Sequence, residues 1–314
     1  MNRKQRVVAL GGGTGLPVVL QALKPGRVPW EPDGCDVTAI VTVTDDGGSS
    51  GRLRREMGAI PPGDLRNCLV ALSDAPEVLR RLFQHRFSQG ELQGHSFGNL
   101  FITALAEVTG DFAHAVRSLH EILAIRGSIF PSTEESVQLV AEFEDGSTVR
   151  GEEAIPKARR RIRRVSLDPP GCFAPPEACE AIRLADVVIL GPGSLYPSVL
   201  PNLLVRPIAE ALRSSPARKV YVANLATQPG ETDGYAASHH VQALFDHVGR
   251  GACDAVVLNS RPLPPALVAA YRREGASPLE ADVHRLETLG LEVVHADLLA
   301  DGPVASHDPD KLGQ

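Results

Sequence analysis

The sequence is poor in the features that mark membrane-spanning, secreted and nucleic-acid-binding proteins. No segment approaches the roughly 18 consecutive apolar residues of a transmembrane helix. The basic start is followed by only four apolar residues, Val7 to Leu10, before a glycine cluster, so we expect neither a membrane span nor a signal peptide. The formal net charge is −6, which repels nucleic acid and anionic lipid. We therefore expect a cytoplasmic protein without a nucleic-acid partner.

Cysteine and aromatic residues are also scarce. The five cysteines are widely spread and form no C-x-x-C pair, which is typical of reduced thiols rather than of a zinc or disulfide scaffold. Aromatic residues make up 4% of the chain, but hydrophobic residues make up 43%, so the composition is that of a globular protein and not of a disordered one. The 314 residues suffice for one large or two modest domains, at about 150 residues each.

Runs of β-branched residues alternate with helical patterns at both ends of the chain, which predicts an α/β fold. Buried strands are predicted at 6–10, 37–44, 186–190, 219–225, 254–258 and 292–295. The intervening helices are predicted at 16–23, 203–213, 236–248 and 265–273.

The middle of the chain has a different pattern. Helices are predicted at 64–73, 77–87, 98–108 and 112–124, followed by a hairpin of 138–143 with 147–152. We expect one compound domain over 1–314, with a Rossmann-type, mostly parallel sheet flanked by helices. Its core comes from about 6–51 and 171–298, and a mixed helix and β-hairpin insertion comes from about 52–170.

Two glycine-rich loops directly follow predicted buried strands. The first consists of Gly11, Gly12, Gly13, Thr14 and Gly15, and the second contains Gly191, Gly193, Ser194 and Tyr196. Residues without a Cβ allow successive backbone N–H groups to converge on an anion at a helix N-terminus. The first loop matches neither the dinucleotide fingerprint nor the P-loop. We interpret both loops as seats for a phosphate or pyrophosphate, the alternative for the first being a tight turn that binds nothing.

An acidic loop follows the second predicted strand. It contains Asp45, Asp46, Gly47, Gly48, Ser49, Ser50 and Arg52. Adjacent carboxylates suit a divalent cation, a ribose hydroxyl or a proton transfer, and the hydroxyls and guanidinium suit an anion. The alternative is ordinary turn chemistry.

Further polar residues stand at helix starts or after strands. Asp64 is a good N-cap, whereas Asn67 has no comparable structural explanation. His95, near Asn99, is a candidate phosphate donor or acid–base group, although a lone histidine is more often structural. A last group, Asn224, Thr227, Gln228, Glu231 and Thr232, follows the strand at 219–225.

The carboxyl ends of parallel strands meet at one edge of a sheet, where α/β proteins bind ligands. The convergence of these loops therefore predicts a phosphorylated, nucleotide-like ligand. The cation-rich run 157–164 has a separate interpretation: it favours a solvated edge strand over a site for an anionic partner.

Six motifs in order resemble the YvcK family of gluconeogenesis factors, within the superfamily of CofD-like 2-phospho-L-lactate transferases. They are GGGTGL at 11–16, DDGGSSGR at 45–52, PPGDLRN at 61–67, GHSFGNL at 94–100, GPGSLY at 191–196 and TQPGETDGY at 227–235. The resemblance extends from about Val7 to Leu298.

The resemblance implies a CofD-like fold and a cytoplasmic, UDP-sugar-binding regulator, with UDP-N-acetylglucosamine as an example of the ligand, required for cell shape and cell-wall supply during gluconeogenic growth. It implies that Asp45 and Asp46 match a loop that serves Mg²⁺ and acceptor in the transferases, and that Tyr271 matches a tyrosine linked to UDP-sugar binding. The chain departs from the family at Ser306, where an arginine is expected, and at Pro197, where a hydroxyl residue is usual.

Our first hypothesis is a ligand sensor without turnover, with a cell-wall synthesis protein as its partner and a homo-oligomeric state. The alternative is a Mg²⁺-dependent, CofD-type transferase of a phospholactyl or related nucleotide-linked group. A dehydrogenase is a weaker third hypothesis, because Asp45 lies 30 residues beyond Gly15 (45 − 15 = 30) rather than the usual 20 or so.

Overall fold

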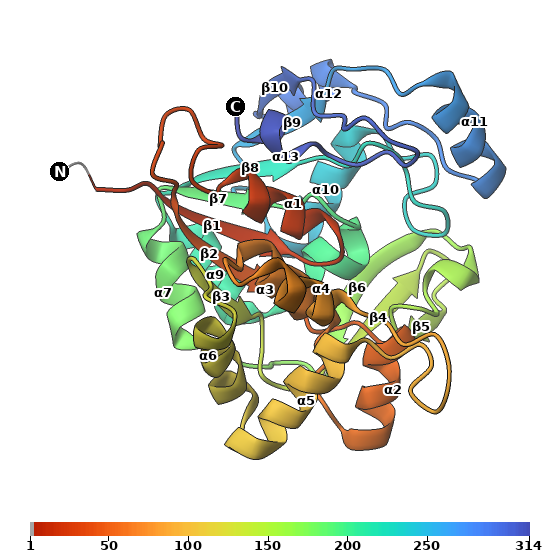
Figure 1. Cartoon of the computed structure of the whole chain (residues 1–314). Helices are drawn as coiled ribbons and strands as arrows, with labels where there is room; N and C mark the ends of the chain where they lie inside the picture. The colour runs from red at the N-terminus through yellow and green to blue at the C-terminus, as the bar shows by residue number, and fades with distance from the viewer. Residues whose placement is uncertain (1–2) are drawn as a thin grey trace.

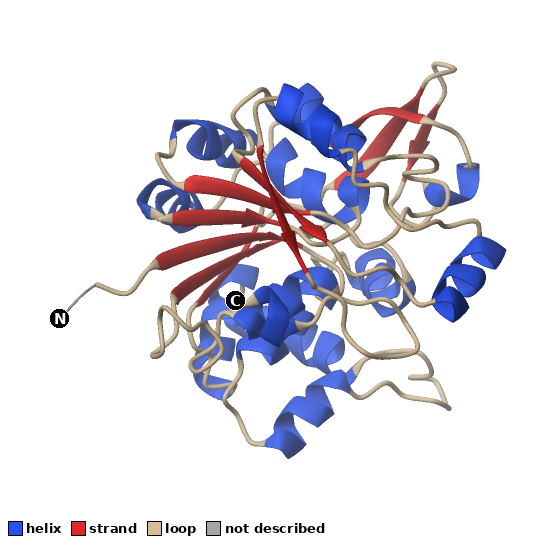
Figure 2. Cartoon of the chain, turned by 90° about the horizontal axis from the view of Figure 1, so that it is seen from above, coloured by secondary structure: helices blue, strands red, loops and turns tan. Residues whose placement is uncertain are grey.

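The computed structural model describes residues 3–314, and its centre is a parallel sheet of seven strands (Figures 1 and 2). The strand order is β10-β9-β8-β7-β1-β2-β3. The strands are β1 (Arg6–Gly11), β2 (Asp36–Val41), β3 (Ser128–Pro131), β7 (Val187–Leu190), β8 (Arg218–Val222), β9 (Ala255–Asn259) and β10 (Glu292–Ala296). The expected α/β fold with a mostly parallel sheet is confirmed.

Alternation along β1 explains why the sheet is covered on both faces. Val7 and Ala9 belong to one hydrophobic cluster, while Val8 and Leu10 belong to the other. Successive side chains of a strand point to opposite faces, so a continuous apolar run requires helices on both sides. Figure 2 shows the sheet between two groups of helices.

Each helical layer packs on its own cluster. The first layer contains α1 (Gly15–Ala22), α3 (Gly63–Leu72), α4 (Glu77–Gln84), α5 (Phe97–Thr109) and α6 (Phe112–Ile122). The second contains α7 (Pro176–Leu184), α8 (Leu200–Leu204), α9 (Arg206–Ser214), α10 (Ala237–Val248) and α12 (Val283–Thr288). The remaining helices are α2 (Gly48–Met57), α11 (Pro265–Glu274) and α13 (Pro309–Leu312). None of the helices formed by residues 3–314 has both the length and the apolar character needed to cross a bilayer.

A second, antiparallel sheet has the order β5-β4-β6. It consists of β4 (Gln138–Phe143), β5 (Thr148–Arg150) and β6 (Ile162–Asp168). The predicted hairpin is β4 with β5, and β6 is an edge strand. Surface ion pairs join the cations of 157–164 to acids on neighbouring turns and strands, for example Arg163 to Glu142 at 2.8 Å and Lys157 to Glu153 at 2.8 Å.

Several boundaries differ from the sequence prediction. β3 lies inside the expected insertion, yet it pairs with β2. The predicted helix at 203–213 is divided into α8 and α9 at Val205, two residues before Pro207, which has no N–H to continue the helix. The acidic loop ends at Gly47, because Gly48 begins α2, so Ser49 and Ser50 lie in a helix. The division into core and insertion stays a prediction.

Candidate functional site

A cavity of about 290 Å³ lies beyond the carboxyl ends of β1, β7 and β8. The chain leaves β1 toward β2 on one side, while β7 pairs with β1 on the other. Such a reversal of strand order opens a crevice in α/β sheets. The cavity is lined by Gly13, Thr14, Gly15, Val18, Pro192, Gly193, Ser194, Ser198, Asn224, Leu225, Ala226, Thr227, Gln228, Tyr271, Ala305, Ser306 and His307.

The two glycine loops pack backbone against backbone at the floor of this cavity. A Cβ on Gly15 would lie 2.1 Å from the carbonyl oxygen of Pro192, so no larger residue fits there. Gly13 adopts a φ of +61°, in the left-handed region that favours glycine. Asn202 also ties the loop in place, because its amide donates to the Gly11 carbonyl at 3.1 Å. The predicted loops are therefore one joined surface.

Amide and hydroxyl groups form the wall that follows β8. The Asn224 side-chain oxygen accepts a hydrogen bond from the Gly193 N–H at 3.1 Å, and its NH₂ donates to Gln228 at 3.2 Å. Gln228 in turn donates to the hydroxyl of Ser194. These bonds connect the second glycine loop to the loop after β8.

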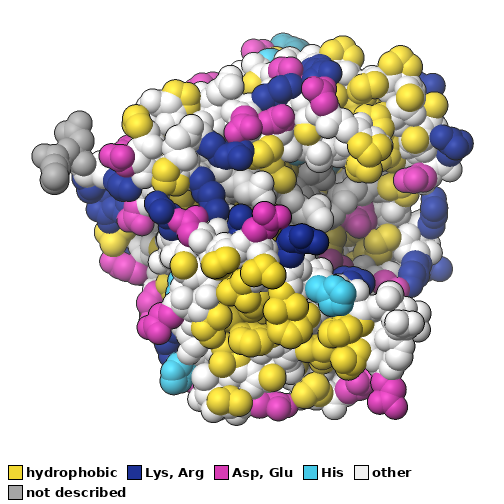
Figure 3. Space-filling model, in the orientation of Figure 1, with side chains coloured by type: hydrophobic (Ala, Val, Ile, Leu, Met, Phe, Trp, Pro, Cys, Tyr) yellow, Lys and Arg dark blue, Asp and Glu magenta, His cyan; other side chains and the backbone are white. Residues whose placement is uncertain are grey.

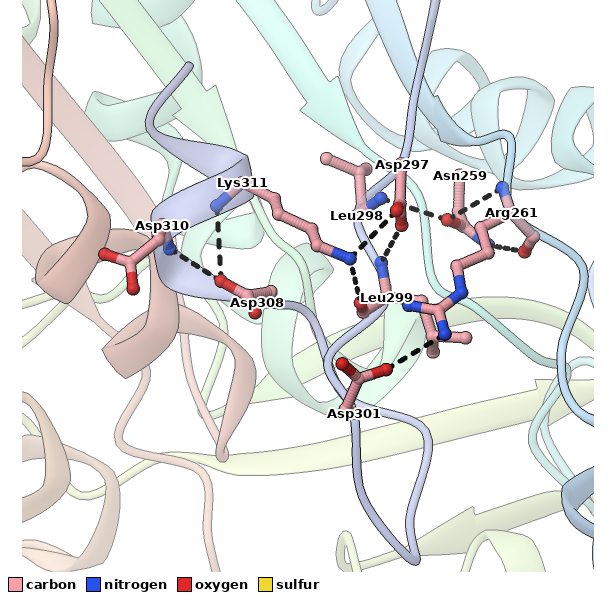
Figure 4. A network of polar contacts seen from close by, with 9 residues as sticks. All are labelled: Asn259, Arg261, Asp297, Leu298, Leu299, Asp301, Asp308, Asp310 and Lys311. Atoms are coloured by element: carbon pink, nitrogen blue, oxygen red, sulfur yellow. Dashed lines mark hydrogen bonds and ion pairs between the residues drawn. The ribbon is translucent and has the colours of Figure 1, made fainter.

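Another wall of the cavity is a segment that we call the strap, defined as Leu299–Asp308. It folds back on itself, since Leu299 and His307 form an antiparallel bridge. The N–H of Ala305 donates to the Tyr271 hydroxyl at 3.1 Å, and His307 donates from Nε2 to the Ala223 carbonyl at 3.2 Å. Figure 4 shows the bonds at its base: Lys311 contacts Asp297 at 2.9 Å and the Leu299 carbonyl at 2.8 Å.

The cavity lining carries polar groups but no formal charge. It contains no Lys, Arg, Asp or Glu among the described residues. Burial lowers the pKa of His307 to about 4, so this ring is neutral near pH 7. An anion bound here would be held by backbone N–H groups at the start of α1 and by the surrounding hydroxyls and amides.

The acidic residues lie behind the first glycine loop rather than in the cavity. Asp64 accepts a hydrogen bond from the Gly13 N–H, and a Cβ on Gly12 would lie 2.4 Å from an Asp64 oxygen. Burial raises the pKa of Asp64 to about 7, with a further contribution from Asp45. The predicted N-cap role of Asp64 is wrong, because Pro62 precedes α3 and Asp64 lies in its buried first turn.

A second buried carboxyl, Glu152, belongs to the same region. It accepts a hydrogen bond from Thr44 at 3.2 Å, and burial raises its pKa well above the usual range. The nearby charges of Asp64 and Asp45 act in the same direction.

The adjacent aspartates of the acidic loop serve the local backbone. Asp45 accepts from the Gly47 N–H at 3.0 Å, while Asp46 accepts from the Glu153 N–H at 2.9 Å. Residues 3–314 contain no group of three or more acidic, histidine or cysteine side chains arranged to hold a metal ion. Mg²⁺ is commonly held by one or two carboxylates together with substrate phosphates and water, so a role of Asp45 and Asp46 as Mg²⁺ ligands stays a prediction.

The other candidates near the acidic loop form a buried hydrogen-bond network. The Ser49 hydroxyl lies 3.1 Å from His95 Nδ1, and Asn99 donates to Ser50 at 3.3 Å. Asn67 donates to the Gly13 carbonyl at 3.4 Å, which links this network to the cavity floor. Arg52 is not part of this network: its guanidinium makes an exposed hydrogen bond to the Gln93 carbonyl at 2.8 Å.

Four predicted residues of the second glycine loop and of the loop after β8 do not line the cavity: Gly191, Tyr196, Glu231 and Thr232. Tyr196 is buried, and its hydroxyl lies 2.8 Å from that of Tyr235. Thr232 accepts from the Gln228 N–H at 2.8 Å and so supports the loop from below. Burial, with the neighbouring Asp233, raises the pKa of Glu231 to about 7.

Sequence reasoning missed Val18, Ser198, Ala305 and His307 as lining residues. Val18 follows the first loop by one helical turn, a spacing that could have identified it. The strap residues offered no such signal, because their position depends on contacts with segments distant in the sequence.

Comparisons with known proteins agree with this architecture. Residues 7–299 match the family described as 2-phospho-L-lactate transferase CofD. The chain is 48% identical to a gluconeogenesis factor from Halalkalibacterium halodurans, over 99% of this chain and 95% of that protein. It is 47% identical to the gluconeogenesis factor of Bacillus subtilis, over 99% of this chain and 97% of that one.

A solved structure shows the same fold. The crystal structure of a member of the UPF0052 family from Bacillus halodurans superimposes with a TM-score of 0.95 at 47% identity, covering 100% of this chain and 98% of the other.

Proposed function

We propose, on the premise that this chain belongs to the gluconeogenesis factors of the CofD family, that it binds a UDP-sugar such as UDP-N-acetylglucosamine and acts as a regulator without turning it over. In this role it would support cell shape and cell-wall supply during gluconeogenic growth, through a cell-wall synthesis protein as partner, in the cytoplasm.

The observation that carries the proposal is the cavity at the reversal of strand order, with Gly13, Gly15 and Gly193 on its floor. Backbone N–H groups at the start of α1 provide the diphosphate seat. The amides of Asn224 and Gln228 and the hydroxyl of Thr227 provide hydrogen-bonding groups for a base or sugar.

The absence of turnover is supported by the chemistry of the lining. General acid–base catalysis needs a group that gains or loses a proton near the working pH. The lining of the described cavity offers His307, whose pKa of about 4 keeps it neutral while its Nε2 is engaged with a backbone carbonyl.

Calorimetric titration tests this proposal. The purified protein is titrated with UDP-N-acetylglucosamine, GDP and NAD, each with and without Mg²⁺. We expect binding of UDP-N-acetylglucosamine that does not require Mg²⁺. If the protein binds GDP but neither of the other two ligands, and does so only when Mg²⁺ is present, this result would contradict the sensor hypothesis and favour the transferase.

The match to the CofD family supports a second candidate function, that of a CofD-type transferase. In that case the acidic pair Asp45 and Asp46 would hold the Mg²⁺, with the buried carboxyls Asp64 and Glu152 close to it behind the first loop. Incubation with a guanylyl-linked phospholactyl donor and a deazaflavin acceptor, followed by mass spectrometry of the acceptor, would detect the transfer.

A further inference from the structure

The largest apolar surface in view lies over α4 and α5, on the face of the molecule shown in Figure 3. Val78 is 76% exposed and Leu82 40% exposed, one helical turn apart on α4. Val108, in the last turn of α5, is 84% exposed. Grouped exposed apolar side chains of this kind mark interaction surfaces. We call this surface the α4–α5 face.

The α4–α5 face stands on a rigid support. Phe83, on the buried side of α4, contacts Phe101 of α5 with ring centroids 5.2 Å apart, and Phe97 lies 6.1 Å away. Phe97, Phe101, Leu105 and Val108 recur at helical spacing along α5 and so form one stripe. The two helices are therefore locked together, and the exposed residues do not need to rearrange to form a contact.

Charges beside the apolar pair are unsatisfied within the chain. Glu77 and Arg81 are exposed one turn apart on α4, next to Val78 and Leu82. Neither has an ion-pair partner among residues 3–314, although many other surface charges do.

These four residues are arranged so that α4 is complementary to a second copy of itself. When two α4 helices pack antiparallel about a two-fold axis, Val78 of each copy lies opposite Leu82 of the other. The same arrangement places Glu77 of each copy near Arg81 of the other. A two-fold contact must be self-complementary in this way.

We propose that two copies of this chain form a dimer through the α4–α5 face, with α4 packed against α4 about a two-fold axis. The apolar pair and its neighbours form the centre of the contact, and the Glu77–Arg81 pairs form its rim. This contact is separate from the nucleotide cavity, so the dimer does not depend on the proposed ligand.

The oligomeric state of the full chain tests the proposal by sedimentation velocity over a range of concentrations. We expect the unaltered protein to dimerise and Leu82→Glu to raise the dissociation constant at least tenfold, because a charge would be buried in the apolar centre. Val78→Glu provides a second disruption at a more exposed position. Leu184→Glu, on α7 in the other helical layer, is the matched control and should dimerise normally.

Charge reversal tests the two-fold geometry itself. Glu77→Arg and Arg81→Glu should each weaken the dimer by roughly threefold to tenfold, as like charges meet across the rim. The double variant restores opposite charges and should recover most of the affinity. Thermal unfolding of each variant checks that the fold is intact.

Three results would overturn the proposal. The first is that the unaltered protein stays monomeric at all concentrations. The second is that the double charge reversal fails to recover the affinity of the dimer, which would exclude antiparallel α4 pairing. The third is that the monomer binds vesicles of anionic lipid and Leu82→Glu abolishes this binding, which would assign the α4–α5 face to a membrane surface.

Discussion

The hydroxyl of Tyr271 on α11 lies 3.1 Å from the backbone nitrogen of Ala305 and accepts its hydrogen bond. The sequence resemblance predicts a role for this tyrosine in UDP-sugar binding, and the structure gives its hydroxyl a contact with the protein itself. Tyr271 thus fixes the strap that forms one wall of the cavity.

Removal of this hydroxyl should loosen the strap. We expect Tyr271→Phe to increase amide hydrogen exchange at 300–306 and to weaken UDP-sugar binding about fivefold, the value of one hydrogen bond. Tyr235→Phe, which removes a hydroxyl paired with Tyr196, is the control and should leave exchange in the strap unchanged. Weaker binding without faster exchange would indicate that Tyr271 contacts the ligand directly.

A bulky side chain at Ser194 should block the cavity. Ser194 lines it and accepts a hydrogen bond from Gln228, so the arginine of Ser194→Arg would fill the space of the ligand. We expect calorimetry to show no nucleotide binding by this folded variant. Ser214→Arg, at an exposed position on α9, should bind normally. Unchanged affinity of Ser194→Arg would place the phosphate site elsewhere.

Ser306→Arg should strengthen binding. The lining of the described cavity has no cation, and Ser306 lies on the strap at the position where the motif resemblance predicts an arginine. A guanidinium there would form charge-assisted hydrogen bonds with a diphosphate, so we expect affinity to rise about tenfold and to become more sensitive to salt. Ser306→Gln, which adds length without charge, is the control. A similar gain in both variants would mean that contact area rather than charge is responsible.

Substitutions in the acidic loop distinguish the sensor hypothesis from the transferase hypothesis. In the double variant with Asp45→Asn and Asp46→Asn, the side-chain amide oxygens can still accept the hydrogen bonds donated by the backbone N–H groups of Gly47 and Glu153. For a sensor we expect UDP-sugar affinity within about threefold of the original and growth retained on a gluconeogenic carbon source. A magnesium-dependent transferase should lose roughly a thousandfold in rate. Retained affinity with lost growth would contradict the simple sensor.

Asp64 predicts a specific pH dependence of stability. Its pKa is about 7 in the folded protein, above the ordinary value of 3.8, so its favourable contribution is complete below pH 4 and is lost as the pH rises toward 7. Relative to Asp64→Asn, the unfolding free energy of the unaltered protein should fall by up to about 1.4 kcal/mol per pH unit over this interval and then level off. Chemical denaturation at several pH values measures it. Parallel curves for the two proteins would show that Asp64 is ionised when folded.

Local patterns sufficed to predict the strand–loop–helix order, because each buried strand is a short apolar run that ends in glycine or a polar residue. β1, which ends at Gly11 and is followed by Gly12–Gly15, and β7, which is followed by Gly191–Ser194, illustrate this. The meeting of these loops at one edge follows from the parallel sheet, a property of the fold class rather than of any single residue.

Long-range packing explains what the sequence did not reveal. β3 has only four residues and ends in proline, so its strand character depends on pairing with β2. The carboxyl of Asp64 has the chemistry of a helix cap, but its burial against Gly12 and Gly13 is determined by the tertiary contact between α3 and the first glycine loop. The strap is positioned by Tyr271, Ala223 and Lys311, and such pairings have no local pattern.

The walls of the cavity are made at very different times during protein synthesis. Gly13 belongs to the first strand–helix unit, whereas Ala305, Ser306 and His307 follow the last strand of the sheet. A nascent chain on the ribosome can complete much of the sheet before this wall exists. The proposed ligand site is therefore complete only in chains synthesised past residue 307, and a chain that stops earlier lacks this wall of the cavity.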